Sequence, residues 1–125
     1  MGKKKSAIVK SGETRMLTSM GNFSFSNCSS LIQFIIPSSI SKIGNFNFYE
    51  CSSLEQITIP SSVTLIGEYA FSYCLSLKQI EIPSSVTKIG EYSFNKCLSL
   101  EQIIIPSSIN KSNLNIPIKT KIITI

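Results

Sequence analysis

The chain has 125 residues, of which 42% are hydrophobic, enough to bury the core of a single domain. It contains neither histidine nor aspartate, so a Ser-His-Asp or Cys-His constellation cannot be assembled. We therefore predict that the protein is not an enzyme and binds no cofactor. The net charge of +5 is concentrated at the two ends, while the part between them is mildly acidic. A nucleic-acid groove needs basic residues on the body of the protein, so we expect no nucleic-acid partner.

Residues 1–15 form a basic N-terminal leader that begins MGKKKS. This start fits the myristoylation pattern M-G-x-x-x-[ST], with Gly2 as the acceptor and Lys3, Lys4 and Lys5 as a second, electrostatic membrane signal. A short basic leader without a lipid is the simpler interpretation. The leader lacks the long apolar segment of a secretory signal. We expect a cytoplasmic location, with the periphery of the plasma membrane or the cell surface, reached without a classical signal, as the alternative.

Residues 16–110 repeat with a period of 23 residues, which is visible in four equally spaced cysteines and four equally spaced prolines. A fixed short period predicts a solenoid, in which each unit buries its apolar side on the next. A degenerate copy lies near residues 8–30, full copies span 31–53, 54–76 and 77–99, and a partial copy covers 100–110.

The copy at residues 54–76 indicates how one unit folds. The alternation in Ile57–Ile59 predicts a half-buried strand, and Pro60 ends it because proline has no N–H to donate. Gly67 marks a tight turn. The residues Ile66, Ala70, Phe71 and Cys74 are spaced to share one face of a short helical turn.

Stacked copies place equivalent residues in columns, since neighbouring strands lie about 4.8 Å apart. We expect core or near-core packing for three such columns. They are Phe25, Phe48, Phe71 and Phe94; Phe23, Phe46, Tyr69 and Tyr92; and Ile43, Ile66 and Ile89.

The recurring pattern L-x-x-I-x-I-P-x-S-[VI]-x-x-I-G-x-x-x-F-x-x-C resembles the BspA-like leucine-rich repeat, the class with a 23-residue period. The resemblance covers roughly residues 16–110. It implies a right-handed leucine-rich repeat solenoid with a parallel β-sheet on the concave face and short helical turns or loops on the convex face. It also implies binding, usually of proteins and often at cell surfaces, without catalysis.

Cys28, Cys51, Cys74 and Cys97 form one line in such a stack. Four sulfurs in a line about 4.8 Å apart cannot surround one zinc ion, which needs each sulfur about 2.3 Å from a common centre. Neighbouring Cβ vectors would be parallel, which disfavours disulfides. We therefore predict a structural ladder of buried, reduced thiols and no metal site.

The outward positions of the strands are the candidate protein-binding face, because variable outward residues carry specificity in solenoids. Beside them, near the start of each strand, lie Ile32, Glu55, Lys78 and Glu101. One outward column is glutamine in every copy, and amides bonded along the stack are its simplest interpretation. In the neighbouring column, Ile35 and Ile104 contact a partner or lie under the tails. The eight face residues are Gln33, Ile35, Gln56, Thr58, Gln79, Glu81, Gln102 and Ile104.

Residues 111–125 leave the 23-residue frame and are predicted to cap the stack, with a final irregular strand within Ile116–Ile125. The leading hypothesis is a non-enzymatic module that binds a protein partner through the strand face. Two alternatives remain: a structural protein that self-associates through its solenoid ends, and a membrane-associated adaptor anchored by its basic N-terminus.

Overall fold

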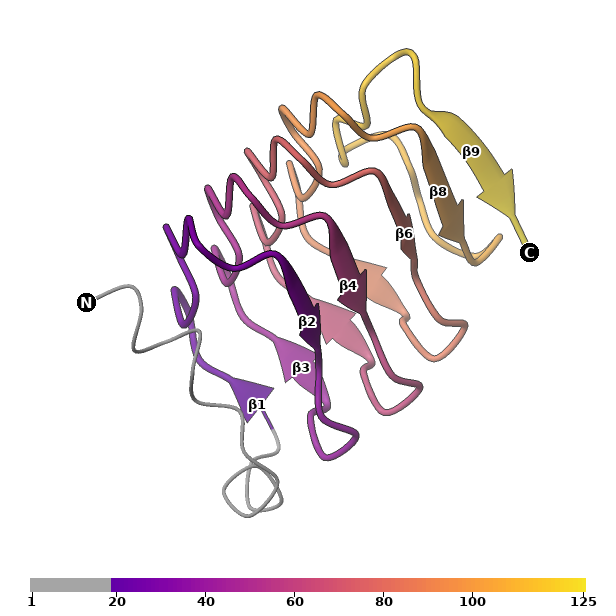
Figure 1. Ribbon diagram of the computed structural model, residues 1–125. Coiled ribbons are helices and arrows are strands. Elements are labelled where there is room, and N and C mark those ends of the chain that lie inside the picture. Colours follow the sequence, from indigo (N-terminus) through magenta and orange to yellow (C-terminus); the bar gives the residue numbers. More distant parts are fainter. Residues whose placement is uncertain (1–18) are drawn as a thin grey trace.

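A computed structural model describes residues 19–125 and shows a solenoid whose successive coils stack along one axis (Figure 1). Every strand pair is parallel. The predicted fold class, a leucine-rich repeat solenoid with a parallel sheet, is confirmed. The proposed lipidation site Gly2 and the lysines Lys3, Lys4 and Lys5 lie outside the described residues.

The longer strands form the ladder that the sequence predicts. In Gln33–Ile35, Gln56–Thr58 and Gln79–Glu81, the central residue is buried and the outer two are exposed. The central phenylalanine or isoleucine therefore points into the core. The register follows the repeat, since Gln33 pairs with Gln56 and Gln79 pairs with Gln102. The strands are β2 (Gln33–Ile35), β4 (Gln56–Thr58), β6 (Gln79–Glu81), β8 (Gln102–Ile105) and β9 (Lys121–Thr124).

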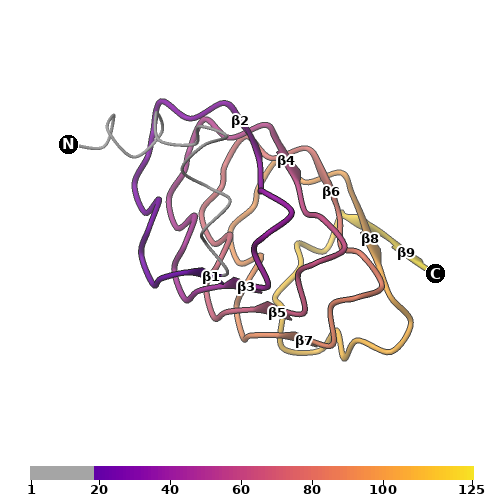
Figure 2. The same cartoon turned by 90° about the horizontal axis from the view of Figure 1, so that it is seen from below.

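A second sheet, which was not predicted from the sequence, runs along another side of the coils (Figure 2). Its strands have two residues each and are hydrogen-bonded in one unbroken order from β1 to β7. They are β1 (Ser19–Met20), β3 (Lys42–Ile43), β5 (Leu65–Ile66) and β7 (Lys88–Ile89). The predicted core column of Ile43, Ile66 and Ile89 lies on these strands.

Turns, and not a helix, form the remaining side of each coil. Tyr49 N–H donates to the Phe46 carbonyl at 3.2 Å, three residues back, whereas Phe48 N–H donates to Ala70 of the next coil at 2.8 Å. Phe46 and Glu50 have φ values of 57° and 59°, which a right-handed helix cannot contain. The short helical turns expected here are therefore separate hydrogen-bonded turns, and residues 19–125 contain no helix.

The two aromatic columns differ in burial. Phe48, Phe71 and Phe94 are fully buried and stack with nearly parallel rings. The other column was expected in or near the core, but Phe23 is 52% exposed and Tyr92 is 38% exposed. Its residues occupy left-handed turn positions, which direct them away from the core and against one another.

The C-terminal segment forms a shorter coil that ends in β9, the strand predicted within Ile116–Ile125. Lys121 pairs with Gln102, 19 positions earlier, whereas Gln56 pairs with Gln33, 23 positions earlier. Leu114 is fully buried in this coil, and its carbonyl accepts the Phe94 N–H at 3.1 Å. The segment thus stays packed on the stack after it leaves the repeat frame.

Candidate functional site

The eight candidate residues lie in two columns on the outward side of β2, β4, β6 and β8, and we call this surface the strand face. Gln33, Gln56 and Gln79 are exposed and Gln102 is half-buried in the first column. In the second column the three residues Ile35, Thr58 and Glu81 are exposed, and Ile104 is half-buried. The strand register places the members of each column directly beside one another.

The two apolar members of the strand face have different surroundings. Ile35 is 65% exposed, and the nearby Ile32 is 56% exposed, so the β2 end presents open apolar surface. Ile104 is half-buried and pairs with Ile123 of the neighbouring strand β9. Of the two outward isoleucines, only Ile104 therefore lies beside the C-terminal tail.

The glutamine column is not bonded through its side chains. Among residues 19–125, the side-chain amides of Gln33, Gln56, Gln79 and Gln102 form no hydrogen bond. The predicted amide ladder is thus wrong. Three of these side chains are exposed, where hydration satisfies an amide without a neighbour, so they are free to bond to a ligand.

The strand face is interrupted between β4 and β6. Hydrogen bonds join β2 to β4, and they join β6 to β8 and β9, but the two groups of strands form separate sheets. Where a junction is closed, an N–H at the start of one strand reaches the preceding coil. Glu55 N–H donates to Ile32 O at 2.7 Å, and Glu101 N–H donates to Lys78 O at 2.8 Å. The equivalent donor at this junction, Lys78 N–H, has no backbone acceptor in the described part of the chain.

The other end of the same junction is also open. Ile36 N–H donates to Thr58 O at 3.0 Å, and Ile82 N–H donates to Ile104 O at 2.8 Å. The equivalent bond from Ile59 is not formed among the described residues. Buried backbone groups are normally paired, so an open junction in an otherwise regular ladder is a distinct feature of this molecule.

The opening is confined to the strand face. On the second sheet, Leu65 pairs with Lys88 across the same two coils. On the turn side, Phe71 N–H donates to Ser93 O at 2.9 Å. The two coils are therefore held together on two sides and separated on the third.

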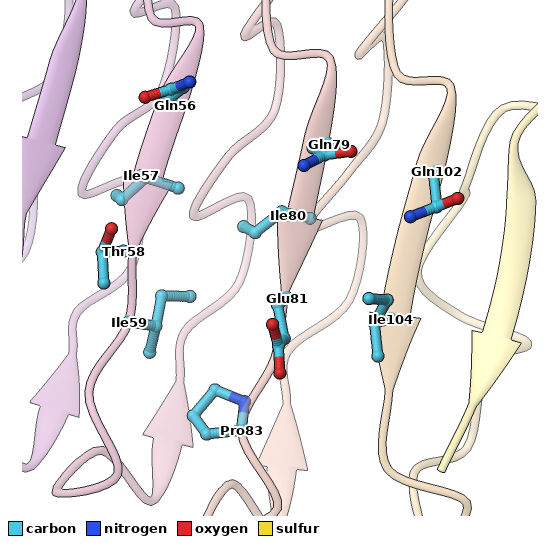
Figure 3. Close-up of a pocket in the computed structure, with 10 residues that line it drawn as sticks. All are labelled: Gln56, Ile57, Thr58, Ile59, Gln79, Ile80, Glu81, Pro83, Gln102 and Ile104. Carbon is cyan, nitrogen blue, oxygen red and sulfur yellow. The ribbon is translucent and has the colours of Figure 1, made fainter.

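A hollow of about 390 Å³ lies at the opening and is lined by ten residues (Figure 3). Glu81 is the one charged residue among them, and its carboxylate forms no ion pair within residues 19–125. Only part of this lining was predicted from the sequence, and the hollow itself was not, since near-identical repeats give no signal for a change at one junction. Six lining residues belong to the strand face: Gln56, Thr58, Gln79, Glu81, Gln102 and Ile104.

All four cysteines are buried, and none of them is part of a disulfide among the described residues. Cys74 donates its Sγ–H to Phe48 O at 3.2 Å, and Cys97 donates to Phe71 O at 3.0 Å. Burial raises the pKa of Cys97 to about 12 and holds the pKa of Cys74 well above its ordinary value. A thiol that keeps its proton is a poor nucleophile, which favours a structural role.

Residues 19–125 contain no cluster of three or more histidine, cysteine, aspartate or glutamate side chains suited to a metal ion. No helix within this range could span a membrane.

Comparisons with known proteins agree with this architecture. The family profile of the BspA type leucine rich repeat region matches residues 13–125 in six copies, and so includes the segment 111–125. A search of curated proteins found no match.

Several solved structures are similar to this chain. A leucine rich cell surface protein from Faecalibacterium prausnitzii A2-165 is 31% identical, with a TM-score of 0.77 over 86% of this chain and 30% of its own. A leucine rich repeat protein from T. pallidum is 30% identical, with a TM-score of 0.68 over 86% of this chain and 45% of its own. The pneumococcal vaccine antigen PcpA shares the fold at 22% identity and a TM-score of 0.69, over 82% of this chain and 33% of its own. The chain spans less than half the length of each of these structures.

Proposed function

Because the chain belongs to the BspA-type leucine-rich repeat family, we propose that it binds a protein partner through the strand face and performs no catalysis. The observation that carries this proposal is the alignment of eight outward side chains on one open surface, hollowed between β4 and β6. The fixed positions of each coil build the core, so the variable outward column of Ile35, Thr58, Glu81 and Ile104 is free to determine specificity.

We further propose a location at the cell surface. The support is the similar Faecalibacterium prausnitzii structure, which is described as a cell surface protein. The cytoplasmic location expected from the sequence receives no support from the relatives, whereas the alternative at the surface agrees with this one.

Site-specific cross-linking tests the binding proposal. A photoreactive residue at Thr58 on the strand face is compared with one at Thr64, another exposed threonine, which directly precedes β5 of the second sheet. We expect adducts with a partner protein from position 58 and not from position 64. Equal labelling from both positions, or labelling from position 64 alone, would contradict the proposal.

A variant with four substitutions measures how much the strand face contributes to the binding affinity. Changing Ile35, Thr58, Glu81 and Ile104 together to serine should weaken binding of the cross-linked partner by at least about tenfold, or about 1.4 kcal/mol. Circular dichroism shows whether the coils remain folded. If the folded variant binds the partner with unchanged affinity, the interface lies on another side of the solenoid.

Self-association is a second candidate, because β9 presents an open edge. Among the described residues, β9 is bonded to β8 alone, and its core-facing Ile122 is 40% exposed. Unpaired edges recruit other strands. Sedimentation over a hundredfold range of concentration should then show dimers that Ile122→Lys dissociates. A constant monomer mass would remove this candidate.

The membrane-adaptor alternative depends on Gly2 and on Lys3, Lys4 and Lys5, which lie outside the described residues. An intact-mass measurement of the protein from a eukaryotic host tests it directly. An added acyl mass supports the adaptor, and an unmodified mass excludes it.

A further inference from the structure

We propose that the hollow between β4 and β6 receives a basic side chain, the guanidinium of an arginine or the ammonium of a lysine, presented by the protein partner. The inference rests on the proposed function and adds the chemistry of the recognised group. It follows from the charge, the hydrogen-bonding groups and the size of the hollow.

The charge of the hollow selects a cation. Glu81 is its one charged lining residue, and it lies on β6 between Thr58 on β4 and Ile104 on β8 (Figure 3). No lysine among residues 19–125 forms an ion pair with it. An acidic group in this position would be repelled, and an apolar group would remove water from the carboxylate without replacing its hydrogen bonds.

The open junction adds acceptors to this charge. The carbonyls of Ile32 and Lys78 accept an N–H from the next coil at the closed junctions, but the equivalent Glu55 carbonyl accepts none from Lys78. The Glu81 carbonyl likewise lacks the bond from Ile59 that its equivalents receive. Guanidinium and ammonium groups have only donors, so the carboxylate and the free carbonyl of Glu81, which lines the hollow, suit them.

The glutamine amides and the size of the hollow complete the match. Gln56 and Gln79 flank the opening from its two sides, and both have unbonded side chains within the described range (Figure 3). The volume of about 390 Å³ is in the range of small-molecule pockets and is enough for one long side chain.

A titration followed by NMR tests the inference. The probe is the tripeptide Ac-Gly-Arg-Gly-NH2, and the control is the same peptide with citrulline, a neutral analogue of arginine. We expect the arginine peptide to shift the backbone amides of Ile59, Lys78 and Gln79, with millimolar affinity. Equal shifts with the citrulline peptide would overturn the inference.

Two variants locate the interaction. Glu81→Gln should weaken binding of the arginine peptide at least fivefold, whereas Glu101→Gln should leave it unchanged. Glu101 is exposed near the same face but does not line the hollow, so the two variants remove the same charge from different places. Equal affinities in both variants would overturn the inference.

Hydrogen exchange tests the opening itself in the free protein. The amides of Lys78 and Ile59 should exchange faster than those of Glu101 and Ile82, their equivalents at the closed junction. Equal protection would mean that the ladder is closed and would remove the site. If the peptide fails to bind while position 58 still cross-links a partner, this inference is wrong and the proposed function stands.

Discussion

Two aromatic columns run two residues apart along the turns, and they stack alike although one is buried and the other is half exposed. Ring centroids in the inner column, from Phe25 to Phe94, are 5.3, 5.4 and 5.7 Å apart. In the outer column, from Phe23 to Tyr92, they are 4.9, 4.8 and 5.2 Å apart. The register of the coils thus brings the rings of both columns within stacking distance, and the more exposed column has the shorter spacing. Burial decides how much each ring stabilises the fold.

The backbone adds a second difference between the columns. All four outer residues have left-handed φ values between 55° and 63°, whereas none of the inner residues has a positive φ. A left-handed conformation costs a residue with a side chain roughly 1–2 kcal/mol. In the outer column, this backbone cost therefore offsets part of the free energy that ring stacking contributes. In the inner column there is no such cost.

Truncating one ring in each column should separate their contributions. Phe71→Ala removes a fully buried ring and leaves a cavity, so we expect the free energy of unfolding to fall by about 3–5 kcal/mol. Tyr69→Ala removes a partly buried ring from the same coil and should cost only about 1 kcal/mol. Urea unfolding of both variants measures the difference. Equal losses would show that the outer stack bears as much of the stability as the core.

The pH dependence of stability extends the comparison to Cys97, whose thiol is hydrogen-bonded to a residue of the inner column. Cys97 donates to the Phe71 carbonyl, and burial raises its pKa from the ordinary 9.0 to about 12. The folded state thus holds this proton more tightly than the unfolded state. The resulting stability is complete below pH 9 and is lost between pH 9 and about 12, by about 1.4 kcal/mol per pH unit.

The serine variant isolates this effect, since serine keeps a hydroxyl donor but does not ionise in this range. The difference in unfolding free energy between the wild type and Cys97→Ser should decline steadily from pH 9 to pH 11. Lysine and tyrosine titrate equally in both proteins and cancel in the difference. A constant difference would mean that the Cys97 thiolate is accommodated in the fold.

The predictable parts of the fold are those that the period encodes in every copy. Ile57–Ile59 alternates and ends at Pro60, and β4 lies there at Gln56–Thr58. The two residues of β3 are too few to show an alternation of polar and apolar side chains. The sequence pattern therefore could not predict the second sheet. The outer column has the same residue types as a core column, and only its backbone, which composition does not reveal, directs it outward.

The candidate site also has a part that the repeat predicts and a part that it does not. Its side chains followed from the outward positions of each strand, and the structure gathers six of them at one hollow. The hollow depends on a single junction between two copies, 54–76 and 77–99, that are nearly alike in sequence. The opening breaks the repeat, so a repeat pattern cannot predict it.

Glycine substitutions give the smallest and most specific test of the two columns. At Tyr69, with φ of 55°, glycine relieves the backbone cost that alanine retains, so Tyr69→Gly should be more stable than Tyr69→Ala by about 1 kcal/mol. Phe71 has no positive φ, so there the order should reverse, with glycine less stable than alanine by roughly 0.5–1 kcal/mol. Urea unfolding of the four variants measures this crossover. If alanine is the more stable substitution at both positions, the left-handed backbone of the outer column costs nothing, and its rings stabilise the fold by their stacking in full.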